Sequence, residues 1–298
     1  MAAQSQNDTK ALWAVISVLA FLFIVFLVFA LALYSTVSSE SSLGEKIGVV
    51  EISDTIVKSD TVVKNLRKFD EDSSVKGIII RIDSPGGSVA ASQEILEAIR
   101  GVNKKSVISM GNMAASGGYY VACSGPKIYA NPGTLTGSIG VISQVVQANE
   151  VLDFLKLKVH TIKTGTYKDS GSPYREFTEA DRKLFTDLGN DIYQQFVDAI
   201  VEARKIPKEE VLKFADGRVL TGKQAKELGL VDELGGFNAA IDDLKKQLNI
   251  KGNVQLVYPS QNANAIVDML LQEGASTLRQ ELKNAANPTE SFQYLYVQ

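Results

Sequence analysis

The chain has 298 residues, a formal net charge of −3 and 45% hydrophobic residues, a composition typical of a folded protein. With no strongly basic stretch, it gives no sign of a nucleic-acid groove. The single Cys123 cannot form an intrachain disulfide, and there is no His cluster and no zinc-ligand spacing. Any catalysis must therefore come from other side chains.

An uncharged apolar segment runs from Ala11 to Leu33, with Ser17 as its one polar side chain. A helix of this length spans about 34 Å, enough to cross a hydrocarbon core of about 30 Å. The alternative is a cleaved signal peptide, whose apolar core has about 7–15 residues and is followed by small residues at the cut. Residues 31–34 offer no such cleavage site. We therefore predict an uncleaved transmembrane helix.

The charges that flank the apolar segment predict its orientation. Lys10 and the amino terminus lie before it, whereas Glu40, Glu45 and Lys46 follow it. The small positive excess on the N-terminal side favours a cytoplasmic N-terminus and an extracytoplasmic remainder.

After a Ser-rich linker, predicted strands and helices alternate along the chain. In order, the patterns predict a strand at 47–52, a helix at 58–69, a strand at 77–82, a helix at 88–100, a strand at 106–110, a helix at 116–123, strands at 127–130 and 139–142, a helix at 149–155, a strand at 159–163, helices at 178–204, 207–214, 222–228 and 237–248, a strand at 254–258 and a helix at 265–282. This alternation predicts an α/β fold with a buried, mostly parallel sheet, in one large domain.

Two glycine-rich turns each follow a predicted buried strand. The first, Asp83–Gly87, allows positive φ angles and close backbone approach, and N–H groups exposed there could stabilise an oxyanion. An ordinary strand-to-helix turn would have the same composition. The second, Asn112–Tyr120, places Ser116 among small residues at a predicted helix start, which resembles a nucleophile turn. The alternative is that Ser116 merely caps the helix.

A nucleophilic serine needs a general base. The single histidine, His160, falls in a predicted strand and follows Ser116 too soon for the chain order of an α/β-hydrolase, so we expect a structural or surface role. A lysine can replace histidine when burial keeps its amine neutral. Lys168 lies in a polar, glycine-rich loop, but composition alone does not separate it from Lys163. A third hydroxyl-rich turn, Thr134–Gly140, could orient such a lysine or could be a simple bend.

Taken together, the motifs resemble those of the signal peptide peptidase A family. The resemblance runs from about residue 47 to residue 247 and rests on segments 83–87, 112–120, 135–142, 167–173, 217–225 and 229–236. Each motif is weak by itself, whereas the ordered set is specific.

The resemblance implies a fold like those of the Clp protease proteolytic subunit and the crotonases, a superhelix of repeated β-β-α units. It also implies a Ser/Lys dyad with Ser116 as nucleophile and Lys168 as general base, needing no metal or cofactor. Gly87 and Gly117 match the N–H donors to the oxyanion, and Ser138 matches the hydroxyl that orients the lysine. We therefore expect the Lys168 amine to be buried and bonded to Ser138.

The family further implies remnant signal peptides and other unfolded peptides as substrates, and a ring- or dome-shaped homo-oligomer. The predicted organisation is a cytoplasmic N-terminus at 1–10, a transmembrane helix at 11–34, a linker at 35–46, a peptidase domain at 47–258 and a C-terminal helix and tail at 259–298. This arrangement predicts a single-pass protein of the cytoplasmic membrane. Two alternatives stay open, a crotonase-like acyl-CoA enzyme and a non-catalytic membrane scaffold on the same fold.

Overall fold

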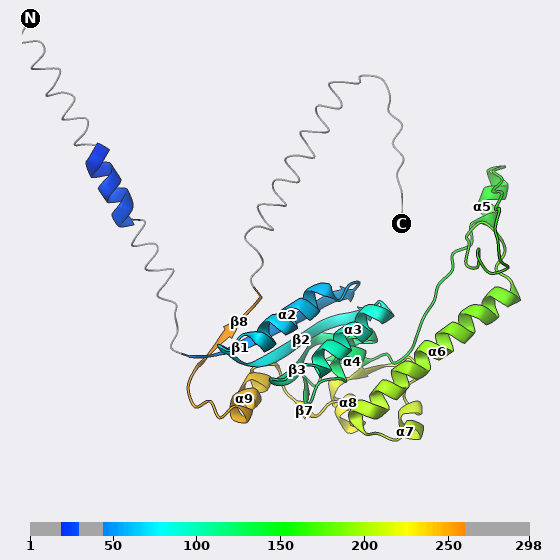
Figure 1. The fold of residues 1–298 in the computed structure, drawn as a ribbon. Helices are drawn as coiled ribbons and strands as arrows, with labels where there is room; N and C mark the ends of the chain where they lie inside the picture. Colours follow the sequence, from blue (N-terminus) through cyan, green and yellow to red (C-terminus); the bar gives the residue numbers. More distant parts are fainter. Residues whose placement is uncertain (1–18, 30–43, 260–298) are drawn as a thin grey trace, which may run out of the picture.

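The computed structural model describes residues 19–29 and 44–259, and within them a single sheet forms the centre of the fold (Figure 1). Its strands lie in the order β6-β5-β3-β2-β1-β8, with β4 beside β3 and β7 beside β4. The strands are β1 (Glu45–Ile56), β2 (Val75–Gly87), β3 (Lys105–Ala115), β4 (Ile128–Ala130), β5 (Leu135–Gly137), β6 (Val219–Thr221), β7 (Glu233–Leu234) and β8 (Val254–Val257). The described pairs are parallel except β5 with β6, so the predicted α/β class is confirmed.

Helices follow most of the strands. They are α2 (Asp60–Glu71), α3 (Val89–Arg100), α4 (Gly117–Ala122), α5 (Asn149–Phe154), α6 (Glu179–Arg204), α7 (Lys208–Leu212), α8 (Gly222–Glu227) and α9 (Phe237–Gln247). The long helix α6 begins with a capping box between Thr178 and Asp181, which satisfies two of its free terminal N–H groups.

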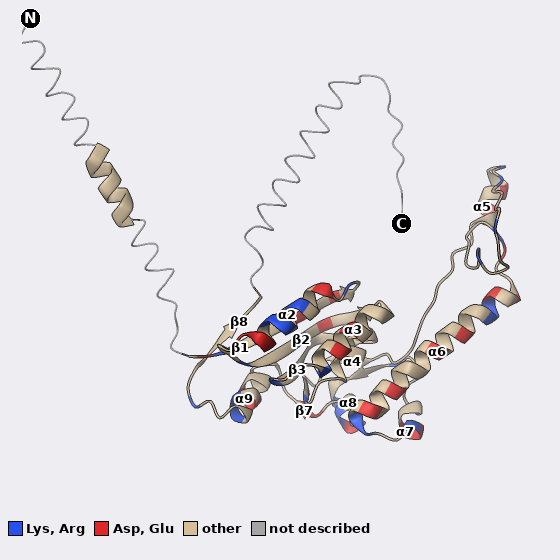
Figure 2. Ribbon diagram, in the orientation of Figure 1, with Lys and Arg blue, Asp and Glu red and all other residues tan. Residues whose placement is uncertain are grey.

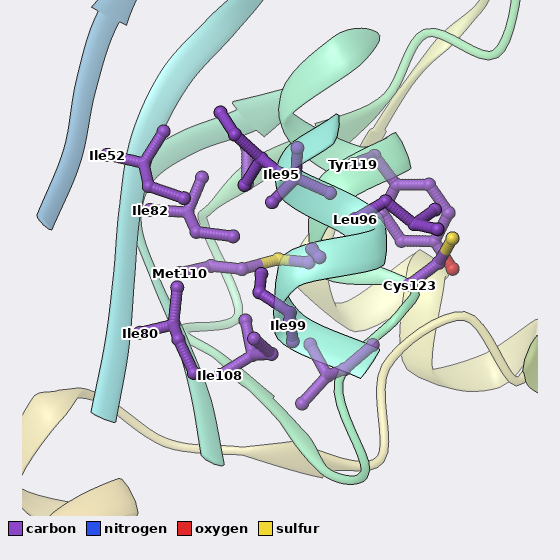
Figure 3. Close-up of a cluster of buried hydrophobic side chains, with 14 of the residues drawn as sticks. Ile52, Ile80, Ile82, Ile95, Leu96, Ile99, Ile108, Met110, Tyr119 and Cys123 are labelled. Atoms are coloured by element: carbon purple, nitrogen blue, oxygen red, sulfur yellow. The ribbon is translucent and has the colours of Figure 1, made fainter. Parts of the chain in front are cut away.

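The central strands are buried on both faces, as the continuous apolar run at 77–82 predicts. On one face Ile80 and Ile82 pack with side chains of α3 and α4 (Figure 3). On the other, Ile79 packs with Val107 and the apolar side of α9. Because both faces are covered, the site can form only where the strands end.

The carboxyl ends of β2 and β3 lie side by side, since the two strands are parallel and in register up to the pair Ile82 and Met110. Beyond that pair the register shifts, and Ser84 faces Ala114. The two glycine-rich turns of the sequence therefore meet at the carboxyl ends of these two central strands.

Two predicted strands are wrong. Residues 139–142 are irregular, because β5 ends at Gly137 and the positive φ of Ser138 turns the chain away from the sheet. Residues 159–163 also form no strand; they are exposed and no described strand lies beside them to complete a ladder. The short strands β6 and β7 were not predicted, since two or three residues show no clear alternation.

Residues 141–178, which we call the arm, connect the turn after β5 to the start of α6. The arm and the first turns of α6 project away from the body (Figure 1). Large apolar side chains on the arm are exposed, among them Ile142, Val146, Phe154 and Ile162. The arm thus presents an apolar surface that no other segment within residues 19–29 and 44–259 covers.

Within the predicted transmembrane segment, residues 19–29 are helical, and the rest of that segment lies outside the described residues. Across residues 19–29 and 44–259, no helix combines the length and apolar character that a membrane crossing requires. The helix predicted at 265–282 also lies outside the described residues.

Candidate active site

Ser116 occupies the sharp turn between β3 and α4. Its φ of 53° and ψ of −122° lie in a region that residues other than glycine rarely adopt. Strain of this kind is characteristic of a nucleophile held at a strand-to-helix turn. The hydroxyl makes no cap bond to α4, so the capping alternative fails and the oxygen is left for chemistry.

The glycine pair of the first turn packs directly against this serine. Gly86 has a φ of 100°, and a Cβ added there would lie 2.5 Å from the Gly117 amide nitrogen and 3.0 Å from the Ser116 Cβ. Gly87 has a φ of 156°, and a Cβ there would lie 2.2 Å from the carbonyl oxygen of Ile56. A side chain at Gly86 would therefore push the two turns apart, and one at Gly87 would displace the end of β1.

Two backbone N–H groups lie near the serine. Gly117 is the first residue of α4, so its N–H has no acceptor within the helix. The Gly87 amide nitrogen lies 3.1 Å from the position of a Cβ on Gly117. Two donors this close to a nucleophile, one of them at a helix N-terminus, can stabilise a negatively charged oxygen.

Ser138 reaches the same site from the neighbouring strand. The Ser116 N–H donates to the carbonyl of Gly137 at 2.9 Å, and the Ser138 N–H donates to the carbonyl of Arg218 at 2.8 Å. Ser138 has a φ of 50°, and both serines line one open groove of about 1250 Å³. The pairing of β5 with β3 and β6 thus places Ser138 beside the nucleophile.

A smaller cavity of about 110 Å³ opens beside Ser116 and Gly117. Its other walls are mostly apolar or uncharged and include Val89, Ser92, Tyr120 and Phe196. A cavity of this size and character, next to two oxyanion donors, can receive a side chain of a bound peptide.

The carboxylate of Asp83 ties the two turns together, and the sequence reasoning missed it. It accepts hydrogen bonds from the Met113 N–H at 3.0 Å and from the Asn112 side chain at 2.9 Å. An acidic residue directly after a buried strand, opposite a second turn, was the available signal. The bonds fix the end of β2 against the end of β3, and hence Gly87 against Ser116.

The structure does not bring the predicted base to the serine within one copy. Lys168 is exposed on the arm and lines neither of the cavities that Ser116 lines. Its expected burial and its bond to Ser138 are therefore absent from a single copy, because the arm projects from the body (Figure 1). His160 is also on the arm and exposed, as its predicted surface role requires.

The hydrogen bonds within the arm distinguish the two candidate lysines. The Lys163 ammonium donates to the Asp169 carboxylate and to the carbonyl of Thr166, so it is engaged by its own loop. Arg175 also binds Asp169, so the described partners of this carboxylate are Arg175 and Lys163 rather than Lys168. Among the described residues, no hydrogen bond or ion pair holds the Lys168 side chain. Of the two lysines, Lys163 is thus the one bonded within its own loop.

The other reactive side chain near the site, Cys123, belongs to the core (Figure 3). Burial raises the pKa of its thiol to about 12, so the thiolate is not present near neutral pH. A cysteine nucleophile is therefore excluded at this position.

Comparison with known proteins agrees with this geometry. Residues 98–251 match the family model of peptidase family S49, and residues 45–136 match that of Clp protease. A Synechocystis sp. protein described as a candidate protease is 40% identical over 66% of this chain and 72% of its own length. A candidate signal peptide peptidase A of Enterococcus faecium is 35% identical over 65% of this chain and 57% of its own length. Protease 4 of Salmonella typhi is 34% identical over 77% of this chain, which spans 37% of that protein.

Proposed function

Because the chain belongs to peptidase family S49, the signal peptide peptidase A family whose motifs it carries, we propose that it is a serine endopeptidase acting through an acyl-enzyme on Ser116. The observation that carries the proposal is the turn at Ser116, strained and uncapped, with the N–H groups of Gly87 and Gly117 beside it. The match to Clp protease supports a Clp protease/crotonase-like arrangement of the sheet.

The proposed reaction needs only groups of the chain. The neutral amine of Lys168 takes the proton of Ser116 as the serine oxygen attacks the peptide carbonyl. The resulting oxyanion is held by the N–H groups of Gly87 and Gly117, each worth about 2.7–4 kcal/mol in comparable sites. The Lys168 ammonium then protonates the leaving amine, and water releases the acyl group by the same proton transfers.

The position of Lys168 leads us to propose that two copies complete each site. The lysine lies on a projecting arm with an exposed apolar surface, whereas the groove at Ser116 is lined by apolar side chains that include Val89, Phe185 and Leu188. Docking the arm of one copy beside the groove of another would bury both surfaces and remove water from the amine. A head-to-tail contact whose rotation closes gives a ring, the form of the proposed homo-oligomer.

The proposal is tested by treating the full-length chain, in detergent micelles, with a serine-directed acylating probe. The modified residue is then mapped by peptide mass spectrometry. We expect stoichiometric labelling at Ser116 together with hydrolysis of an unfolded peptide. Labelling elsewhere, or turnover of an acyl-CoA thioester without peptide hydrolysis, would favour the crotonase-like alternative. A protein that neither labels nor turns over would match the non-catalytic scaffold.

We also propose that the chain is anchored in the cytoplasmic membrane by residues 11–34, with the peptidase domain on the extracytoplasmic side. The described part of this segment, residues 19–29, is helical with every residue exposed, and its ribbon is tan throughout (Figure 2). It bears no charged side chain, and a helix that is apolar on every face belongs in a lipid or protein interior. An anchor would hold the active site near remnant signal peptides, the proposed substrates.

The orientation is tested by adding a protease to intact spheroplasts. The domain after residue 46 should be digested or released, because the charge bias places it outside. A cytoplasmic protein serves as the control for leakage. Protection of the domain until the cells are lysed would reverse the proposed orientation.

A further inference from the structure

A buried carboxylate ties the Lys168 loop to the start of α6. Asp181 is 2% exposed and accepts a hydrogen bond from the Ser170 hydroxyl at 2.6 Å. The guanidinium of Arg175 binds both of its oxygens, at 2.5 and 2.9 Å. Thr178 donates to it through its N–H and its hydroxyl. One side chain thus joins the loop, the arginine and the helix cap.

Arg175 extends the same network to the residue next to Lys168. Its Nη2 donates to the carbonyl of Asp169 at 3.2 Å and to the carboxylate of Asp169 at 3.1 Å. Ser170, one position further on, is held by Asp181. The two residues that directly follow Lys168 are therefore both fixed to the N-terminal end of a 26-residue helix.

The charges of the network persist over the pH range in which a peptidase works. Hydrogen bonds from Arg175, Ser170 and Thr178 hold the pKa of the Asp181 carboxyl well below its ordinary value. The pKa of the neighbouring Asp169 is also lowered, by hydrogen bonds from Arg175 and Lys163. A two-pronged bond between guanidinium and carboxylate also fixes orientation, which a single ammonium cannot do.

This network is more than a helix cap requires. The capping box of α6 is already complete with Thr178 and Asp181, and the contacts of Arg175 and Ser170 satisfy no N–H of that helix. Those contacts instead run to residues 169 and 170, beside the one lysine of the loop that has no partner among the described residues.

We propose that Arg175 and Asp181 form a clamp that fixes the position of Lys168 relative to the start of α6. In this role they are positioning residues for proton transfer. This inference rests on the proposed function. A lysine that must reach a serine on another copy needs a rigid support, because displacement of a catalytic group by about 1 Å can cost about a hundredfold in rate.

Two matched variants separate positioning from capping. Ser170→Ala and Thr178→Ala each delete one hydroxyl that donates to Asp181, one from the Lys168 loop and one from the helix cap. Both are made in the full-length chain, and thermal unfolding, kcat and KM for an unfolded peptide are measured. We expect Ser170→Ala to lower kcat by about tenfold with KM within about twofold, as loss of one bond to a charged group allows.

Thr178→Ala should keep kcat within about twofold of the parent. It should nevertheless lower the unfolding temperature at least as much as Ser170→Ala does, because it removes the helix cap. Ser170→Thr retains the hydroxyl and should restore most of kcat. Equal losses of kcat in Ser170→Ala and Thr178→Ala, or an unchanged kcat in Ser170→Ala, would overturn the clamp. If Ser170→Ala fails to fold, Arg175→Lys takes its place, because it keeps the charge but loses the two-pronged bond to Asp181. The same loss of about tenfold in kcat is then expected.

A double-mutant cycle distinguishes failure of the clamp from failure of the proposed function. In a Lys168→Arg background, Ser170→Ala should lower the residual kcat by less than about twofold, because the group it positions no longer transfers a proton. A further tenfold loss there would assign Ser170 a structural role. Undiminished activity of Lys168→Arg itself would instead refute the proposed function, whatever Ser170→Ala does.

Discussion

Ser116→Ala is expected to lower kcat for peptide hydrolysis by at least about 10⁴-fold, because it removes the oxygen that forms the acyl-enzyme. The fold should be unaffected. The hydroxyl makes no cap bond to α4, and the side chain loses a single atom. The free energy of unfolding should therefore change by less than about 1 kcal/mol. Kinetics on an unfolded peptide and a denaturant titration give the two values.

A matched control for this variant is Ser124→Ala, which also removes one hydroxyl close to α4. Ser124 donates to the carbonyl of Val121 at the far end of that helix and lines neither of the cavities that include Ser116. It should keep full activity. If a folded Ser116→Ala protein retained activity near that of the parent, the nucleophile would be another residue.

Lys168→Arg is expected to reduce kcat by at least about 10³-fold while preserving positive charge, because a guanidinium does not release its proton at working pH. The side chain is exposed in one copy, so stability should change by no more than about 0.5 kcal/mol.

Lys163→Arg serves as the control for Lys168→Arg. Lys163 carries the same charge on the same loop, but it is engaged by Asp169 and Thr166. An arginine can keep a bond to a carboxylate, so this variant should retain most activity. A reversal, with Lys163→Arg inactive and Lys168→Arg active, would make Lys163 the base.

Much of the nucleophile half of the site could be predicted because it depends on local rules. A strand buried on both faces reads as an unbroken apolar run, and a glycine pair or small residues must follow where two turns touch. Those features located β2, β3 and the turns that follow them, whereas the resemblance to the family singled out Gly87 and Ser116 within those turns. The small residues around Ser138 indicated a bend there, although not the short strand β5 before it.

The resemblance pointed to Lys168 as the base, but its place relative to Ser116 did not follow from the sequence, because Lys168 lies on the arm and lines neither cavity that Ser116 lines. The alternation at 159–163 predicts a strand, yet no described strand lies beside those residues, and a ladder needs a partner. The expected burial of Lys168 likewise assumed a neighbour that one copy does not supply. The clamp of Arg175 and Asp181 joins residues of a loop and a helix whose spacing carries no motif beyond the capping box.

The central claim is that Ser116 of one copy and Lys168 of another make one active site, and mixing two inactive variants tests it most directly. Ser116→Ala and Lys168→Arg are co-expressed with different tags, purified through both tags in succession and assayed on an unfolded peptide. Random association in equal amounts gives roughly one quarter of the sites an intact serine and an intact lysine, so about one quarter of the parent's activity should return. A doubly tagged, folded assembly as inactive as either variant alone would contradict the claim.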